Sequence, residues 1–89
     1  MNDVRLMAYE ARVNVTWRGQ NGDLRDAVAY DSGDGDIKAW VAEAIGTGAV
    51  EGVRAERRVD LRDFVVDRFP ASAQIPFNRI FLRPKTPFG

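Results

Sequence analysis

The chain has 89 residues, enough for one modest hydrophobic core but not for two domains. Its 13 acidic residues balance its 13 lysines and arginines, so no net field attracts nucleic acid or an anionic membrane, and we expect neither as a partner. The absence of cysteine and histidine excludes disulfides and thiol catalysis, and we expect no metal and no cofactor. The first residues do not resemble a signal peptide, and we expect a cytoplasmic protein.

The first predicted element is an antiparallel hairpin. Apolar and polar residues alternate over 11–19, which predicts a half-buried strand. The turn residues "GQNGD" at 19–23 include Asn21 and Gly22, which tolerate positive φ, and "LRDAVAYD" at 24–31 is predicted to return as a weaker strand. The residues expected on the buried face of the first strand are Ala11, Val13, Val15 and Trp17.

A helix is predicted after the breaker cluster "DSGDGD" at 31–36. Asp36 suits the N-cap position, Asp34 lies near the positive end of the helix, and Lys38 is expected beside both acids. Gly46 and Gly48 should end the helix after about three turns. An apolar stripe should cover the sheet. Its residues are Ile37, Trp40, Val41, Ala44 and Ile45.

The second half of the chain is expected to complete the sheet. Neither period dominates over 49–60, which we predict to be irregular or a short strand. Residues 63–69 have the β-branched and aromatic content of a strand, although a helical turn would also suit them. The last strand, 79–83, should turn Ile80 and Leu82 toward the core. These elements predict an α+β fold with a mixed four- or five-stranded sheet, one helix on one face, and the first and last strands adjacent in its centre.

No motif in the sequence indicates catalysis. The two serines, Ser32 and Ser72, lie in no nucleophile motif, and no strong base is predicted beside either. The acids of 31–36 lack the spacing of a calcium-binding loop, and a turn with a helix cap explains them. The glycines of "GTGAVEG" follow a helix, whereas a phosphate site would precede one. We therefore expect no enzyme activity, and we place Trp17 and Trp40 in the core.

An extended arm is predicted after the last strand. Pro84 and Pro87 lack amide protons, so residues 84–89 should project from a domain formed by residues 1–83. A hairpin, a single helix and a last strand leading into an arm that ends in Gly89 resemble the β-grasp of ubiquitin-like proteins. The segments that carry the resemblance are "ARVNVTWRGQNGDLRDAVAYD", "DIKAWVAEAIG" and "RIFLRPKTPFG". The nearest kind is the bacterial ubiquitin-like proteins encoded beside activating and conjugating enzymes, some of which serve phage defence.

This resemblance implies a role for the arm as a protein modifier. The Gly89 carboxylate would be adenylated by an E1-like enzyme using ATP, passed to an E2-like enzyme and joined to a target protein, from which a peptidase could release it. Pro84, Lys85, Pro87 and Phe88 would be recognised by these enzymes. The chain departs from ubiquitin and from sulfur carriers in ending Phe-Gly where they end Gly-Gly.

A partner surface is predicted on the outer face of the last strand. Alternation turns Phe81 away from the core between Arg79 and Arg83, and an aromatic ring beside arginines suits a protein interface. A loop that covers Phe81 is the alternative. For the whole chain, the alternatives to a modifier are an interaction module that is not conjugated and a sulfur carrier with a thiocarboxylate at Gly89.

Overall fold

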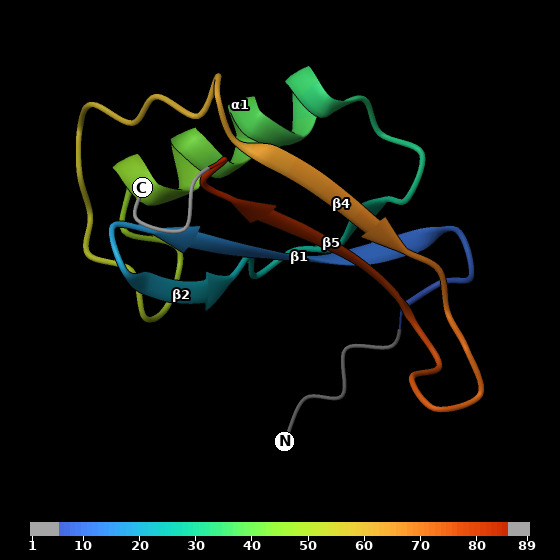
Figure 1. Ribbon diagram of the computed structural model, residues 1–89. Coiled ribbons are helices and arrows are strands. Elements are labelled where there is room, and N and C mark those ends of the chain that lie inside the picture. The colour runs from blue at the N-terminus through green and yellow to red at the C-terminus, as the bar shows by residue number, and fades with distance from the viewer. Residues whose placement is uncertain (1–5, 86–89) are drawn as a thin grey trace.

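Five strands and one helix make up the part of the chain described by the computed structural model, residues 6–85. In chain order the elements are β1 (Glu10–Trp17), β2 (Gln20–Asp23), β3 (Val28–Ala29), α1 (Asp34–Gly46), β4 (Val65–Phe69) and β5 (Asn78–Arg83). The sheet has the order β2-β1-β5-β4, with β3 also paired to β1, and α1 lies along one side of it (Figure 1). The predicted α+β class with a mixed sheet and one helix is confirmed.

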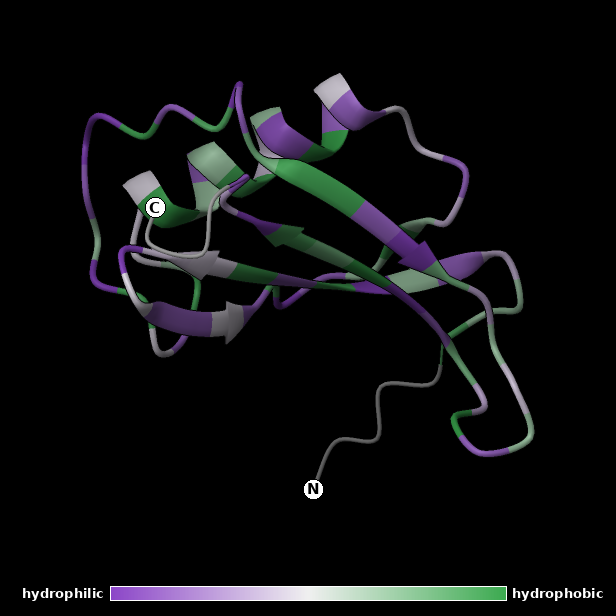
Figure 2. Cartoon of the chain, in the orientation of Figure 1, coloured by the Kyte–Doolittle hydropathy of each residue, from purple (hydrophilic) through white to green (hydrophobic). Residues whose placement is uncertain are grey.

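The centre of the sheet is formed by the first and last strands, as predicted. β1 and β5 run parallel, with Val13 opposite Ile80, and β4 is antiparallel to β5. Burial alternates along both central strands, and along β1 most of the buried residues are hydrophobic and their neighbours hydrophilic (Figure 2). The apolar set points toward α1 and is buried, which stabilises the fold by about 1.5–3 kcal/mol for each fully buried side chain. From these strands it comprises Ala11, Val13, Val15, Trp17, Ile80 and Leu82.

The turn of the hairpin lies earlier than the sequence predicts. Trp17 pairs with Gln20, so the turn residues are Arg18 and Gly19, with φ of 51° and 76°. Positive φ at both central positions is the conformation that two-residue hairpins favour. Gly22 is needed for close packing instead, because a Cβ there would come within 2.2 Å of the Glu51 carbonyl oxygen. The predicted turn at 19–23 is therefore wrong, and most of it forms β2.

The returning strand is interrupted by a bulge. Asp23 pairs with Asn14, whereas Val28 pairs with Ala11, so the returning chain uses two more residues than β1 does over this stretch. The chain bends at 25–26 and resumes pairing only over the two residues of β3. The predicted strand at 24–31 is thus reduced to a short segment beyond the bulge.

The helix begins earlier than predicted. Gly33 is its N-cap and offers no side-chain hydrogen bond, so the assignment of Asp36 as N-cap is wrong. Asp34 and Asp36 lie in the first turn, where the positive end of the helix dipole favours carboxylates. The helix ends at Gly46, and Gly48 has a φ of 75°, in agreement with the predicted stop.

The buried stripe of α1 is narrower than predicted. Ile37, Val41 and Ile45 are fully buried, while Ala44 packs at the edge of the core. Trp40 is 42% exposed, so its assignment to the core is wrong, whereas Trp17 is buried as predicted. Three residues spaced by four give a stripe that covers the two central strands and leaves Trp40 beside them.

The segment between α1 and β4 is irregular, as one of the two alternatives for 49–60 predicted. It nevertheless completes the core with Val50, Val53 and Leu61. Phe64 lies at its end and packs against Trp17, with ring centroids 5.7 Å apart. The following strands, β4 and β5, match the predicted strands within two residues at each end.

Two polar side chains, one near the end of β4 and one at the start of β5, hold these strands to neighbouring segments through hydrogen bonds. Arg68 points to the helix side, where its guanidinium donates to the Ser32 carbonyl oxygen at 2.6 Å and pairs with Asp34 at 2.7 Å. The buried Asn78 side chain donates to the carbonyl oxygens of Ala8 and Glu10, both at 2.9 Å. Within residues 6–85, no helix has the length and apolarity needed to cross a membrane.

Candidate partner-binding face

The face of the sheet opposite α1 carries the candidate site, and we call it the open face. Because side chains alternate along each strand, the neighbours of the buried residues point to this side. Its central residues come from three adjacent strands and are half-buried or exposed. They are Arg12 and Asn14 of β1, Arg79, Phe81 and Arg83 of β5, and Val65, Asp67 and Phe69 of β4.

Two phenylalanines and one arginine form an aromatic–arginine cluster on the open face. The rings of Phe69 and Phe81 meet edge to face, with centroids 5.5 Å apart and planes at 68°. The Cζ atom of Arg79 lies 5.4 Å from the Phe69 centroid and 5.7 Å from that of Phe81. Strand register produces this arrangement, because Arg79 is directly opposite Phe69 and two residues from Phe81. Such aromatic and cation–π contacts each contribute roughly 0.5–1.5 kcal/mol.

The prediction for Phe81 is right about the face of the sheet and wrong about the extent of exposure. Phe81 points to the open face as alternation predicts, but it is half-buried, with Phe69 and Arg79 packed against it. The more exposed ring is Phe69, at 44%, which sequence reasoning did not assign to the site. The sequence pattern that could have identified Phe69 is the spacing of Val65, Asp67 and Phe69 by two residues, which puts them on one face of a strand. This pattern is a weak indication, because 63–69 also suits a helical turn.

Arg83, the third predicted residue of this surface, lies outside the cluster. Its Nε donates to Asp67 Oδ2 at 2.8 Å, and its Nη2 also contacts that oxygen. This pair neutralises the cation at the end of β5. Arg83 therefore borders the aromatic–arginine cluster as half of an exposed ion pair, which is worth little to stability on its own.

The open face has two further cations with no ion-pair partner among residues 6–85. Arg12 and Arg79 are direct neighbours across the parallel pairing of β1 and β5, and none of the four ion pairs in this part of the chain includes either. The Nε of Arg79 is buried and has no hydrogen-bond partner within these residues. Like charges side by side repel each other, and an unpaired buried donor costs free energy. A partner carboxylate bound to the two guanidinium groups would relieve the repulsion.

The predicted tail is described only at its beginning. The chain leaves β5 at Arg83, after which Pro84 is half-buried and Lys85 is exposed. This departure lies at the end of the sheet where Leu82 pairs with Val15, close to the hairpin turn. Pro87, Phe88 and Gly89 lie outside the described residues.

The serines occupy structural positions. Ser72 Oγ accepts a hydrogen bond from the Ile75 amide at 3.1 Å, which closes the loop before β5, and the Ser32 carbonyl oxygen accepts the bond from Arg68. In the part of the chain that the structure describes, no three acidic residues gather as a metal site would require.

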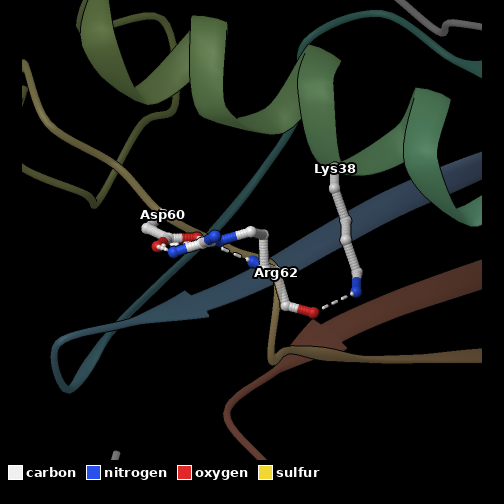
Figure 3. A network of polar contacts seen from close by, with 3 residues as sticks. All are labelled: Lys38, Asp60 and Arg62. Carbon is white, nitrogen blue, oxygen red and sulfur yellow. Dashed lines mark hydrogen bonds and ion pairs between the residues drawn. The ribbon is translucent and has the colours of Figure 1, made fainter.

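Lys38 links the helix to the segment before β4. Its Nζ donates to the Arg62 carbonyl oxygen at 2.9 Å (Figure 3), so the expectation that it lies against Asp34 and Asp36 is wrong. The Arg62 guanidinium in turn binds Asp60, with the shortest contact at 2.7 Å. These side-chain and backbone hydrogen bonds from Arg62 lower the pKa of the exposed Asp60 carboxyl to about 2.

Comparison with known proteins gives no identification. No protein-family model matches the chain, and no curated protein or solved structure is detectably similar to it. The geometry of the sheet, the open face and the surface around α1 therefore provides the basis for inferring what the chain does.

Proposed function

We propose that this chain is a ubiquitin-like β-grasp protein that modifies other proteins through Gly89. One observation carries the proposal: the first and last strands lie parallel at the centre of a mixed sheet, with a hairpin on one side, an antiparallel strand on the other and one helix across a single face. This order of strands is the one that the β-grasp resemblance leads us to expect. A segment that follows β5 would therefore leave from a central strand that is paired on both sides.

The chemistry of the proposed reaction belongs to partner enzymes. A carboxylate is a poor electrophile, so an E1-like enzyme would let a Gly89 oxygen attack the α-phosphorus of ATP, with release of pyrophosphate. An enzyme thiol would then displace AMP, and after transfer to an E2-like enzyme an amine or hydroxyl of the target would displace the thiol. Such sites exclude water, and a residue without a side chain passes most easily into a narrow approach.

The segment between β5 and Gly89 would serve recognition. Pro84 and Pro87 restrict the backbone before binding, which lowers the entropy lost when an enzyme orders the segment. Phe88 would supply an apolar anchor and Lys85 a charged contact. The chain itself would act as substrate and recognition module, and the aromatic–arginine cluster would be a second contact for the enzymes or a deconjugating peptidase.

The decisive experiment uses the chain ending at Gly89 and an E1-like enzyme encoded beside its gene. With ATP we expect pyrophosphate release, a thiol-linked adduct on a non-reducing gel, and loss of that adduct on reduction. Removal of Gly89, or Gly89→Trp, should abolish the adduct without changing the melting temperature, and Asp63→Asn, at an exposed residue before β4, serves as a control that leaves the tail intact. Unchanged adducts without Gly89 would refute the modifier role.

The second candidate function is an interaction module that is never conjugated. The exposed ring of Phe69 and the unpaired arginines beside it favour this candidate, because such a surface can bind a partner whatever happens at Gly89. Binding of a partner protein that survives removal of Gly89 but is lost in Phe69→Ala would support it. A sulfur carrier would instead be recognised by exchange of one Gly89 oxygen for sulfur in the intact mass.

A further inference from the structure

A groove of about 450 Å³ lies on the other side of the molecule, between α1 and the bulged edge of the sheet. Its apolar lining includes Leu24 and Val28 from the two ends of the bulge, and Ala44 and Trp40 from the helix. Trp40 is the most exposed of these apolar residues and presents 42% of its surface to solvent. The groove is separate from the open face.

The bulge explains why the groove exists. The two extra residues move 25–26 out of line with β1, so the edge of the sheet does not close against α1 there. Trp40 lies three residues after the buried Ile37 and one before the buried Val41, which turns it to the flank of the helix facing this gap. An indole is therefore held beside the opening.

The charge around the groove is negative. Asp26, Glu43 and Arg25 line it, and Asp36 lies one helical turn before Trp40 on the same flank of α1. Within residues 6–85, none of these carboxylates forms an ion pair. Two acids against one base in the lining, with Asp36 nearby on the helix, leave a local excess of negative charge, although the chain as a whole is neutral.

We propose that this groove binds an arginine or lysine side chain on an extended segment of a partner protein. The aliphatic stem of such a side chain would pack on Leu24, Val28 and Ala44, and its cation would lie over the Trp40 ring within reach of Asp26 and Glu43. Arginine is the better fit, because its planar guanidinium stacks on an indole and binds carboxylates through two nitrogens. The proposal is independent of Gly89 and of conjugation.

The groove is unsuited to the opposite class of ligand. A carboxylate or phosphate entering it would meet the excess of acids and the negative face of the indole ring. A purely apolar side chain would fill the volume but would leave Asp26 and Glu43 partly desolvated without a partner, which costs free energy. The cation with an apolar stem satisfies both parts of the lining.

The two tryptophans provide a direct test in the full-length, ¹⁵N-labelled protein. The probe is the capped peptide acetyl-Gly-Leu-Arg-Leu-Gly-amide, and its counterpart has Glu in place of Arg. We expect the Arg peptide to shift the indole N–H signal of Trp40. The signal of Trp17 should stay in place, because its Nε1 donates to Glu56 at 3.1 Å in the half-buried interior. Equal shifts with the Glu peptide, or no shift of Trp40, would overturn the proposal.

Charge-removing variants separate recognition from folding. Asp26→Asn and Glu43→Gln change exposed side chains, and each should weaken binding of the Arg peptide by a factor of about two to five at low ionic strength. Trp40→Leu should abolish the measurable binding. Asp63→Asn is the matched control, since Asp63 is exposed and lies just before β4, outside the groove, and it should bind normally.

Two further results would contradict the proposal. One is equal weakening by Asp63→Asn and Glu43→Gln, which would show a nonspecific charge effect. The other is a Trp40 signal that moves with protein concentration in the absence of peptide, which would show that a second copy of the chain occupies the groove. If Trp40→Leu loses the dispersed amide spectrum of a folded chain, the two charge variants still decide the result.

Discussion

The aromatic–arginine cluster of the open face and the groove beside α1 both combine aromatic rings with charged side chains. The charge beside the rings is positive in the cluster and mainly negative in the groove. On the open face, Phe69 and Phe81 lie under Arg79, with Arg12 alongside. In the groove, Trp40 lies among Asp26 and Glu43. The aromatic–arginine cluster is therefore cationic and the groove lining has two acids against one base, although the chain has 13 charges of each sign. Zero net charge excludes a long-range field but permits local recognition of both acidic and basic partners.

The two surfaces also arise in different ways. The aromatic–arginine cluster results from regular pairing, since the register of β4 on β5 puts Arg79 opposite Phe69. The groove results from an interruption of pairing, where β1 faces two extra residues. A surface built on regular strands is held by the ladder, while one beside a bulge depends on what packs against the bulged edge. Substitutions should therefore affect the two surfaces unequally.

The largest effect is expected at the bulged edge, for Gly22→Ala. The new Cβ would lie 2.2 Å from the Glu51 carbonyl oxygen and 2.8 Å from Val50 Cγ1, so the backbone of 50–52 must move. We expect a loss of about 2–3 kcal/mol in the free energy of unfolding, measured by urea denaturation. NMR shifts should spread to the groove and be smaller at the aromatic–arginine cluster, because β1 separates β2 from β5 and β4.

Gly35→Ala is the matched control for that substitution. A Cβ at Gly35 meets nothing within 4 Å and lies in the first turn of α1, where alanine is the better helix former. We expect it to be neutral or to stabilise by roughly 0.5–1 kcal/mol. Equal destabilisation by the two substitutions would show that the contact between Gly22 and Glu51 is not close.

An intermediate effect is expected on the open face. Phe81→Ala should lower the free energy of unfolding by about 1–2 kcal/mol, because the ring is half-buried and supports both Phe69 and Arg79. Phe69→Ala should cost about half as much, since its ring is 44% exposed. Parallel urea titrations measure the difference, and a larger loss for Phe69→Ala would reverse the assignment of the two rings.

The smallest effect is expected for Asp60, which belongs to neither surface. Hydrogen bonds from Arg62 lower its pKa from 3.8 to about 2, so the folded state favours the carboxylate. The pair therefore stabilises the fold above pH 3.8 and loses that contribution as the pH falls toward 2. An NMR titration of the Asp60 carboxyl should give a midpoint below 3.8, whereas a midpoint at or above 3.8 would contradict the contact.

Asp60→Asn should barely change the melting temperature, because both partners are exposed and water screens the pair. The change in melting temperature measures how much an exposed ion pair contributes to the stability of this protein. A charge substitution at the groove or the open face can then be compared with Asp60→Asn. If it alters peptide binding while changing stability no more than Asp60→Asn does, its effect is on recognition.

Sequence patterns identified the elements whose residues serve one purpose. Alternation in β1 and β5 placed Val13, Val15, Ile80 and Leu82 correctly, since burial alone decides those positions. Local sequence patterns failed where one residue type can serve two structural roles. Gly22 resembles a turn residue and is a packing residue, and Asp36 resembles an N-cap and lies in the first turn.

The two surfaces were less predictable than the core, because they depend on register. The Trp40 side chain lies on the flank of α1 beside the buried stripe, where it lines the groove next to the two-residue bulge, and no local pattern indicates that bulge. The contribution of Phe69 needs the alignment of β4 on β5, although Phe81 and Arg79 were identified from alternation alone. The roles of Pro87, Phe88 and Gly89 stay predictions, as these residues lie outside the described part of the chain.

The central pairing of β1 with β5 has a consequence for synthesis on the ribosome. Val13 cannot meet Ile80 until most of the chain has been made, so the inner edge of β1 stays unpaired while the rest emerges. Contacts between residues so distant in sequence also make folding slow relative to a helical protein of this size. A nascent chain that stops before β5 lacks the strand that joins β1 to β4, so it exposes apolar residues that Ile80 and Leu82 cover in the folded protein.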